Sequence, residues 1–396
     1  MLKELPVLLL TGYLGSGKTT LVNRILSNKK GIKFAVIVND IGEVNIDADL
    51  IEKGGVVGKK DDSLVSLQNG CICCTLKMDL VEQLREITSM KKFDYIVIEA
   101  SGVCEPEPIA RTICSIPTMG PQYIKDGLIK LDCIVTVVDA LRMKDEFDAA
   151  AGLMRPNLDE DDIENLLVQQ VEFCNIILLN KADEVSSDDL GRIYQILRAL
   201  QPKAEIIETN YGDVDLEKII NTEKFNYDSV ATSATWISEV EGPAHHDDDD
   251  DDHEHHHEHH HHHHDHDHEE GEAEEYGIGT YVYYARKPMD MNKFDNFVAK
   301  HWPKGIIRAK GLCYFAGETD ICYVFEQAGK QISLKNVGQW FATMPKDQLA
   351  EMMDNDPILR RDWDPVYGDR MQKLVFIGQH LDKSAIKEGL DATLID

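Results

Sequence analysis

The stretch PVLLLTGYLGSGKTT at residues 6–20 constrains the fold more than any other part of the sequence. A short apolar run is followed by a glycine-rich turn and then by a helical pattern. The spacing G-x-x-x-x-G-K-[ST] is matched without a mismatch by Gly12, Gly17, Lys18 and Thr19. In such a turn backbone N–H groups surround phosphate oxygens, and the N-terminus of the following helix adds positive partial charge. The stretch therefore predicts a strand, a phosphate-binding loop and a helix.

The residue types in this loop suit a nucleotide with bound magnesium. Lys18 can reach the β- and γ-phosphates, and the Thr19 hydroxyl can bind Mg²⁺. We expect both to take part in catalysis. A chance glycine-rich turn is the alternative, which the flanking strand and helix patterns disfavour. The residues expected to contact the nucleotide here are Gly12, Gly15, Ser16, Gly17, Lys18, Thr19 and Thr20.

Four more apolar runs accompany this strand in the first 225 residues. They are continuous and rich in β-branched residues, as in strands that are buried on both faces of a parallel sheet. Helical patterns such as 18–28 and 78–90 separate them, and the runs occupy residues 33–39, 95–100, 133–140 and 174–180. The pattern predicts an α/β fold of the P-loop NTPase kind, a layered parallel sheet with helices on both faces.

Asn180-Lys181-Ala182-Asp183 follows the last of these runs. Asp183 would accept hydrogen bonds from the two N–H donors on the guanine edge, while Asn180 and Lys181 brace the loop and the ring. Adenine has no such donor pair, so a buried Asp183 would be left unpaired, and such sites reject the wrong base strongly. After a phosphate-binding loop the motif favours GTP over ATP. Residues 208–213 lie where a guanine-contacting loop is expected, although their sequence is not specific.

Further candidate residues follow two other predicted strands. Glu99 ends the run YIVIE, where a carboxylate can hold Mg²⁺-bound water, and Gly102 can approach the γ-phosphate through its N–H. Asp40 and Glu43 lie in the loop 39–47, where a nucleotide-sensing switch with metal ligands could form. An ordinary strand end and solvated loop acids are the alternatives.

Cys71, Cys73 and Cys74 form a second candidate site. Thiolates bind soft or borderline cations, and a tetrahedral zinc site takes four ligands. Three local thiolates with an exchangeable fourth position suit a site that accepts and releases metal, and no second Cys-x-x-Cys pair is present to close it. A core strand and an iron–sulfur or redox role are the alternatives. The turn-forming Asn69-Gly70 before the cysteines favours a loop.

Residues 241–275 hold 14 of the 16 histidines and 16 acidic residues, with no Lys or Arg. We expect a disordered segment at a domain boundary, because it has almost no apolar surface to bury. Neutral imidazoles suit Zn²⁺, Co²⁺ and Ni²⁺, so the tract is expected to capture or buffer metal. A solvated spacer is the alternative. The expected ligands are His253, His255, His256, His257, His259, His260, His261, His262, His263 and His264.

A second domain is expected from Tyr276 onwards. Apolar runs alternate there with helical stretches at 290–301 and 383–392, which predicts a smaller α+β domain. The runs lie at 278–285, 305–315, 321–326 and 373–379. The expected division is a nucleotide-binding domain at 1–228, the tract at 241–275 and the α+β domain at 276–396.

The net charge and the cysteine pattern limit which binding partners and which cellular compartment are expected. The net charge is −30, and −14 remains outside the tract, so nucleic acid and anionic membranes are not expected partners. The nine cysteines show no secreted-domain spacing, and the apolar run at the N-terminus is too short for a signal or membrane segment. We expect a cytoplasmic protein with reduced thiols. Four cysteines in apolar runs are expected to be buried, namely Cys133, Cys174, Cys313 and Cys322.

TGYLGSGKTT, VNDIGEVNID, NGCICC, IEASG and NKAD occur in the order found in the CobW-like GTPases, which are relatives of the HypB and UreG metallochaperones. GIIRAKG (305–311) and YGDRMQKLVFIG (367–378) are similar to the CobW C-terminal domain. The resemblance implies slow hydrolysis of GTP to GDP and phosphate, and delivery of a metal. It assigns phosphate and Mg²⁺ roles to 12–19 and Glu99, guanine roles to the N-K-A-D segment, and the metal role to the three clustered cysteines.

The sequence thus predicts a GTP-hydrolysing metallochaperone that uses GTP and Mg²⁺ and carries Zn²⁺, with Co²⁺ or Ni²⁺ as other cargoes. Its expected partner is a client metalloprotein, and its expected state is a monomer or a nucleotide- or metal-dependent homodimer. The family also contains accessory GTPases for cobalamin synthesis and for cobalt or iron enzymes of the nitrile hydratase type. These remain alternatives, as do a histidine-rich metal store and an ATPase.

Overall fold

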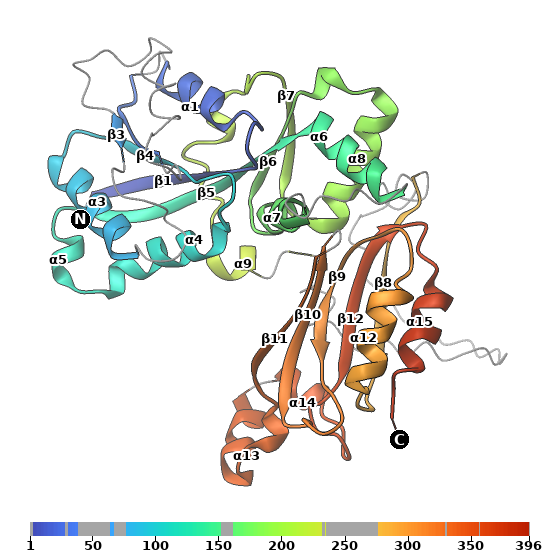
Figure 1. Ribbon diagram of the computed structural model, residues 1–396. Coiled ribbons are helices and arrows are strands. Elements are labelled where there is room, and N and C mark those ends of the chain that lie inside the picture. Colours follow the sequence, from blue (N-terminus) through green and yellow to red (C-terminus); the bar gives the residue numbers. More distant parts are fainter. Residues whose placement is uncertain are drawn as a thin grey trace, which may run out of the picture. The chain divides into compact units, whose positions relative to one another are not determined.

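The computed structural model describes residues 3–27, 31–38, 64–66, 77–151, 161–231, 234, 276–328, 331–355 and 357–395. The chain divides into two compact units, Met1–Thr235 and Trp236–Asp396. Figure 1 shows the helices and strands of each unit. The tract 241–275 lies outside the described residues, so the three expected segment boundaries stay predictions.

The first unit is built on a seven-stranded sheet in which each neighbouring pair is parallel. The strand order is β3-β2-β4-β1-β5-β6-β7. The bounds are β1 (Glu4–Thr11), β2 (Phe34–Val38), β3 (Leu64–Ser66), β4 (Tyr95–Glu99), β5 (Leu128–Asp139), β6 (Ile176–Asn180) and β7 (Glu205–Thr209). The predicted α/β class is confirmed.

Helices cover both faces of this sheet (Figure 1). Every residue of β2, β4 and β6 is buried, as the continuous apolar runs require. On one face, Leu21, Val22 and Ile25 of α1 pack against alternate residues of the central strands. The helices are α1 (Lys18–Leu26), α3 (Lys77–Met90), α4 (Pro106–Ser115), α5 (Pro121–Ile124), α6 (Ala140–Ala151), α7 (Asp161–Glu172), α8 (Ser187–Leu200) and α9 (Tyr227–Ala231).

The strand order determines where a ligand can bind. β1 lies between β4 and β5. The strands that follow β1 in the chain, β2 to β4, lie on one side of it, and β5, β6 and β7 lie on the other side. Parallel strands bring their carboxyl ends to one edge, and ligands bind where the order reverses. The loop after β1 therefore lies at this reversal, beside the ends of β4 and β5.

The second unit is a five-stranded antiparallel sheet of order β11-β10-β9-β12-β8. Phe294, Phe297 and Val298 of α12 and Ile386 and Leu390 of α15 form one core with the sheet. The predicted small α+β domain is confirmed. The elements are β8 (Ile278–Ala285), α12 (Met291–Lys300), β9 (Ile306–Cys313), β10 (Ile321–Ala328), β11 (Gln331–Gln339), α13 (Lys346–Asn355), α14 (Pro357–Arg361), β12 (Gln372–Gln379) and α15 (Lys383–Asp391).

Strand β11 is the element of this sheet that the apolar runs did not predict. In the described part of the chain it pairs with β10 alone, at the edge of the sheet, and none of its residues is fully buried. Its sequence QISLKNVGQ is mostly polar. An exposed edge strand needs no continuous apolar run, so its sequence carries no such signal.

A charge cluster around the buried Glu326 crosses β9, β10 and β11. The carboxylate of Glu326 pairs with Lys310, with Lys335 at 3.3 Å and with Arg308 at 3.9 Å. The Arg308 side chain has no exposed surface, and that of Glu326 is 9% exposed. Burial alone would raise the pKa of Glu326, but the three cations outweigh it and lower this pKa from 4.5 to about 2. The cluster thus needs an ionised carboxylate.

We expect Glu326→Gln to lower the free energy of unfolding at pH 7 by about 3 kcal/mol, because it removes the carboxylate that pairs with buried Arg308 and with Lys310. Since the folded-state pKa of Glu326 is depressed, the stabilisation is present above pH 4.5 and is lost as the pH falls towards 2. Wild type should therefore lose more stability than the variant across that range.

Chemical unfolding followed by tryptophan fluorescence measures this effect, because all four tryptophans belong to the second unit. Exposed Glu388 on α15 provides the control variant Glu388→Gln, which should match wild type. Equal stability of Glu326→Gln and wild type at pH 7 would contradict the prediction.

Candidate functional site

The turn between β1 and α1 has the backbone of a phosphate-binding loop. Its glycines have positive φ angles, 134° at Gly12, 77° at Gly15 and 110° at Gly17. A Cβ atom on Gly17 would lie 2.4 Å from Nδ2 of Asn180, so no larger residue fits there without displacing that side chain. The turn therefore requires glycine both for its conformation and for close contact with β6.

The ammonium group of Lys18 is held over this turn. Its Nζ donates hydrogen bonds to the carbonyl oxygens of Gly12 at 2.8 Å and Tyr13 at 3.1 Å. Lys18 and Ser16 are buried, whereas Thr20 is exposed. The Ser16 hydroxyl has no hydrogen-bond partner among the described residues. The loop thus presents a cation and a hydroxyl at the position where its motif predicts phosphates.

Thr19 and Glu99 meet beside the loop. The Thr19 hydroxyl donates a hydrogen bond of 3.0 Å to Oε1 of Glu99, which is the last residue of β4. The register of β1 and β4 pairs Leu10 with Glu99, which brings the carboxylate to the start of the turn. A hydroxyl and a carboxylate oxygen are hard donors of the kind that Mg²⁺ takes. This pair therefore fits the magnesium ligand set expected from the sequence.

Gly102 packs against the same loop from the turn after β4. A Cβ atom there would lie 2.6 Å from the backbone nitrogen of Leu14, so only glycine permits this approach. Gln170 of α7 is fully buried, and its Nε2 donates to the carbonyls of Gly102 at 3.2 Å and Cys104 at 3.1 Å. The sequence did not reveal Gln170, because a single glutamine in a helical pattern carries no motif.

Asn180 joins the loops at the ends of three strands. Its Nδ2 donates to the carbonyl of Ser16 at 2.7 Å, and its Oδ1 accepts from the N–H of Gly212 at 3.1 Å. Lys181, with a φ of 59°, forms an ion pair with Asp139 at the end of β5. Asp139 was also missed, and its only signal was its place at a strand end. The N-K-A-D segment is thus fixed to the phosphate-binding loop.

Asp183 differs from the expectation. Its side chain is exposed, whereas the base-discrimination argument assumed a buried carboxylate. Its backbone N–H donates to Oδ1 of Asn210 at 3.0 Å, which holds the segment against the loop after β7. The segment ends in a short 3-10 turn at the surface, which explains the exposure. Discrimination against adenine then requires the base itself to cover the carboxylate.

The expected metal ligands Cys71, Cys73, Cys74, Asp40 and Glu43 and the histidines of the tract lie outside the described residues. Within the described ranges, no group of three or more His, Cys, Asp or Glu side chains is placed to hold a metal. The four cysteines expected in the core are buried. Burial raises the pKa of Cys174 and of Cys322 to about 12, so both stay protonated at neutral pH.

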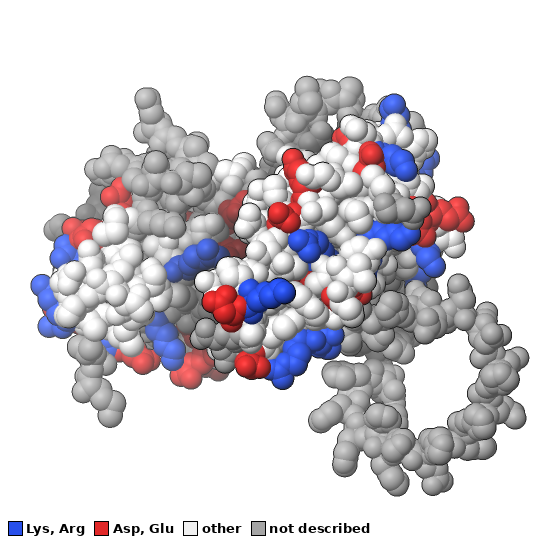
Figure 2. Space-filling model, turned by 90° about the horizontal axis from the view of Figure 1, so that it is seen from below, with Lys and Arg blue, Asp and Glu red and all other residues white. Residues whose placement is uncertain are grey.

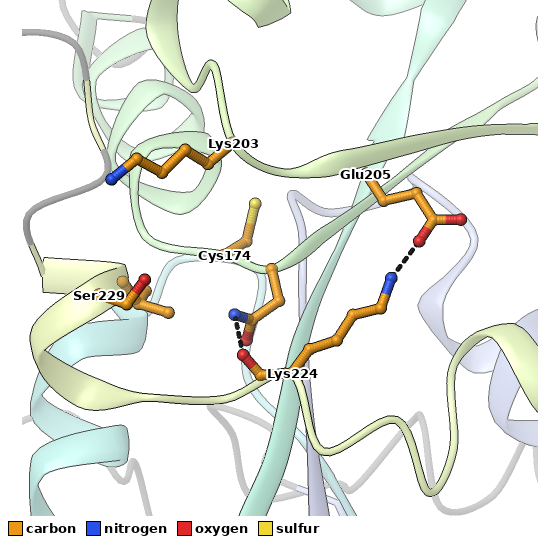
Figure 3. A pocket seen from close by; sticks show the side chains of 7 residues that line it. Cys174, Lys203, Glu205, Lys224 and Ser229 are labelled. Atoms are coloured by element: carbon orange, nitrogen blue, oxygen red, sulfur yellow. Dashed lines mark hydrogen bonds and ion pairs between the residues drawn. The ribbon is translucent and has the colours of Figure 1, made fainter. Parts of the chain in front are cut away.

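A separate cavity of about 210 Å³ lies at the amino ends of β6 and β7, at the opposite edge of the sheet from the phosphate-binding loop. In Figure 3, Lys224 extends to Glu205, with which it forms an ion pair, and Lys203 points in a different direction. The polar groups of this cavity do not converge on one point, so we assign it no ligand.

Surface charge and hydropathy add two observations. On the face shown in Figure 2, Lys and Arg side chains are interspersed with Asp and Glu. The charge imbalance of the chain rests mainly on residues 241–275, which hold 16 acidic residues and no basic one.

Among the helices that the structure describes, none combines the length and the apolar character needed to cross a membrane.

Comparison with known proteins gives two family matches. Residues 6–208 match the family described as CobW/HypB/UreG, nucleotide-binding domain. Residues 278–394 match the cobalamin synthesis protein cobW C-terminal domain.

Two curated relatives and one solved structure are similar to this chain. The zinc-regulated GTPase metalloprotein activator 1 of Dictyostelium discoideum is 33% identical over 99% of this chain and 80% of its own length. The zinc chaperone YjiA of Escherichia coli is 32% identical over 57% of this chain and 63% of its own length. The crystal structure of the Zn(II)-bound YjiA GTPase from E. coli aligns with a TM-score of 0.40 at 20% identity, covering 99% of this chain and 100% of that chain.

Gly15 and Gly17 of the loop offer a matched test of its packing. Ala at position 15 or 17 adopts a left-handed backbone at a cost of about 1–2 kcal/mol. Only Gly17→Ala also collides with Asn180, because among the described residues no atom beyond the two chain neighbours lies within 4 Å of a Cβ on Gly15. We expect Gly17→Ala to be less stable than Gly15→Ala by a further 1–3 kcal/mol or so.

Urea unfolding followed by circular dichroism measures the difference. In an Asn180→Ala background the two glycine variants should become equally stable, because the colliding amide is gone. An undiminished difference in that background would show that Asn180 is not the cause.

Proposed function

The chain belongs to the CobW/HypB/UreG family, and from this membership we propose that it is a GTP-hydrolysing metallochaperone. It binds a transition metal, with zinc as the favoured cargo, at Cys71, Cys73 and Cys74. It passes this metal to a client metalloprotein under the control of the bound nucleotide.

The contact that carries the proposal is the amide of Asn180. One side chain bonds to Ser16 of the phosphate-binding loop at 2.7 Å and to Gly212 of the loop after β7 at 3.1 Å. A nucleotide with its phosphates on the first loop therefore has its base within reach of the N-K-A-D segment. Asp183 then accepts from the guanine N–H groups, which favours GTP over ATP.

The residues around the loop supply the chemistry of hydrolysis. Lys18 offsets negative charge on the β- and γ-phosphates, and the Gly102 N–H approaches the γ-phosphate. Thr19 and Glu99, whose oxygens lie 3.0 Å apart, would hold Mg²⁺, and a magnesium ion there would supply positive charge next to the phosphates. We expect slow intrinsic turnover of GTP and water to GDP and phosphate.

The metal part of the proposal rests on the sequence and on the names of the relatives. The three cysteines lie in the chain between the loop 39–47, where a nucleotide-sensing switch is expected, and Glu99 and Gly102, which are expected to contact magnesium-bound water and the γ-phosphate. A change of nucleotide would therefore alter the geometry of the thiolate site, while the histidine tract collects metal. Thermodynamic linkage between the two sites then works in both directions. If GTP changes the affinity for zinc by some factor, zinc must change the affinity for GTP by the same factor.

The base contact is tested by Asp183→Asn. The amide of Asn presents an N–H where the carboxylate would accept one from guanine. We therefore expect GTP affinity to fall by roughly 10- to 100-fold, the effect of one lost hydrogen bond to a charged group. Affinity for xanthosine triphosphate, which has a carbonyl at that position, should rise. The neighbouring exposed Glu184 gives the control Glu184→Gln, which should leave both affinities unchanged. Unchanged GTP affinity in Asp183→Asn would contradict guanine recognition.

The metal site is tested with a chain that lacks residues 243–270. We expect this chain to keep one tightly bound zinc ion, because three thiolates bind zinc without the histidines. Replacement of Cys71, Cys73 and Cys74 by Ser should remove that ion. The measurement is zinc affinity by competition with a chromophoric chelator, repeated with GTP and with GDP.

The outcomes separate the alternatives. Loss of all tight zinc binding on deletion of the tract would favour a histidine-rich store over a chaperone. Equal zinc affinities in the GTP and GDP forms would exclude nucleotide control of the metal site.

A further inference from the structure

Tyr211 is held in a conformation that its own side chain disfavours. Its φ angle is 51°, in the left-handed region that bulky residues rarely adopt. Its side chain is 70% exposed, so the ring gains little from packing against the protein. Neither the strain nor the exposed ring stabilises the fold. Strained residues of this kind are concentrated at sites of function.

The two neighbours of Tyr211 are bound to the N-K-A-D segment. Asn210 accepts a hydrogen bond from the backbone N–H of Asp183 at 3.0 Å. Gly212 donates from its backbone N–H to Asn180 at 3.1 Å. Tyr211 therefore lies between two contacts to the residues that we propose to recognise the base.

The loop that carries Tyr211 is fixed from a third direction. Arg24 of α1 donates from Nε to the carbonyl of Tyr211 at 2.8 Å and from Nη1 to Oδ1 of Asp213 at 2.7 Å. Two further hydrogen bonds lie within the loop. The Asp213 N–H donates to the carbonyl oxygen of Asn210 at 3.0 Å, and the Thr209 hydroxyl donates to the carbonyl oxygen of Asp213 at 3.0 Å. These bonds explain how the strained backbone is maintained.

We propose that the ring of Tyr211 is a stacking platform for the nucleotide base. This inference rests on the proposed GTP site and deepens it. Stacking on an aromatic ring is tolerant of base identity, because every base has a π-face. Tyr211 therefore supplies affinity for any base, whereas Asp183 selects guanine. The hydrogen bonds of the loop hold the backbone of Tyr211 in place, so that at this position binding has only the ring itself to order.

The test compares three variants at position 211. Tyr211→Gly removes the ring and suits the left-handed backbone, so the fold should be at least as stable while GTP affinity falls roughly tenfold or more, the usual effect of one lost aromatic–base stack. Tyr211→Phe keeps the ring and should bind GTP as wild type does. Tyr211→Trp places a tryptophan in the first unit, where its fluorescence should be quenched when GTP binds.

The choice of probe separates stacking from other effects. Tyr211→Gly should lower the affinity for GTP and the affinity for inosine triphosphate by the same factor, both measured with Mg²⁺. It should leave the affinity for inorganic tripolyphosphate unchanged, because tripolyphosphate has no base. Glu223 has a φ of 52° and is exposed, so Glu223→Gly is a matched control for relief of backbone strain. It should leave all three affinities unchanged.

The inference is overturned if Tyr211→Gly binds GTP as tightly as wild type does, or if the substitution lowers the affinities for tripolyphosphate and for GTP by the same factor. Either result leaves the proposed function standing, provided that wild type prefers GTP to ATP. Failure of wild type to bind GTP would instead overturn the proposed function, and this inference with it.

Discussion

The nucleotide site depends on one amide side chain. Asn180 donates to Ser16 in the phosphate-binding loop and accepts from Gly212 in the loop after β7. Because both bonds come from one planar group, the distance between the two loops is set. Gly17 packs so closely on this amide that a single added carbon would collide with it. The glycine of the motif is thus required by a contact as well as by the conformation of the turn.

Helix α1 extends this arrangement along its length. Its first residue, Lys18, places an ammonium group over the phosphate-binding turn. Two turns later Arg24 holds the loop that carries Tyr211. One rigid helix thus connects the phosphate-binding loop with the loop that we propose to contact the base. Changes in the position of the helix would act on both ends together.

The turn after β4 connects the site with a further helix. Gly102 packs on Leu14, and the fully buried Gln170 of α7 binds the carbonyls of Gly102 and Cys104. A shift of this turn by a bound phosphate would have to stretch two hydrogen bonds to α7. The turn is therefore coupled mechanically both to the phosphate-binding loop and to a helix outside it, which suits an element that reports the nucleotide state.

The sequence by itself determined the strands and the motifs. Strands buried on both faces need continuous apolar runs, and phosphate or guanine contacts need given residue types at short fixed spacings, so both signals are local. Tertiary structure decided which of these residues meet. Asn180 and Ser16 are separated by 164 positions, Thr19 and Glu99 by 80, and Arg24 and Tyr211 by 187. Such contacts follow from the strand order β4-β1-β5-β6-β7, which no local pattern encodes. The same reason explains why Gln170 and Asp139 were missed and why the exposure of Asp183 could not be predicted from its motif.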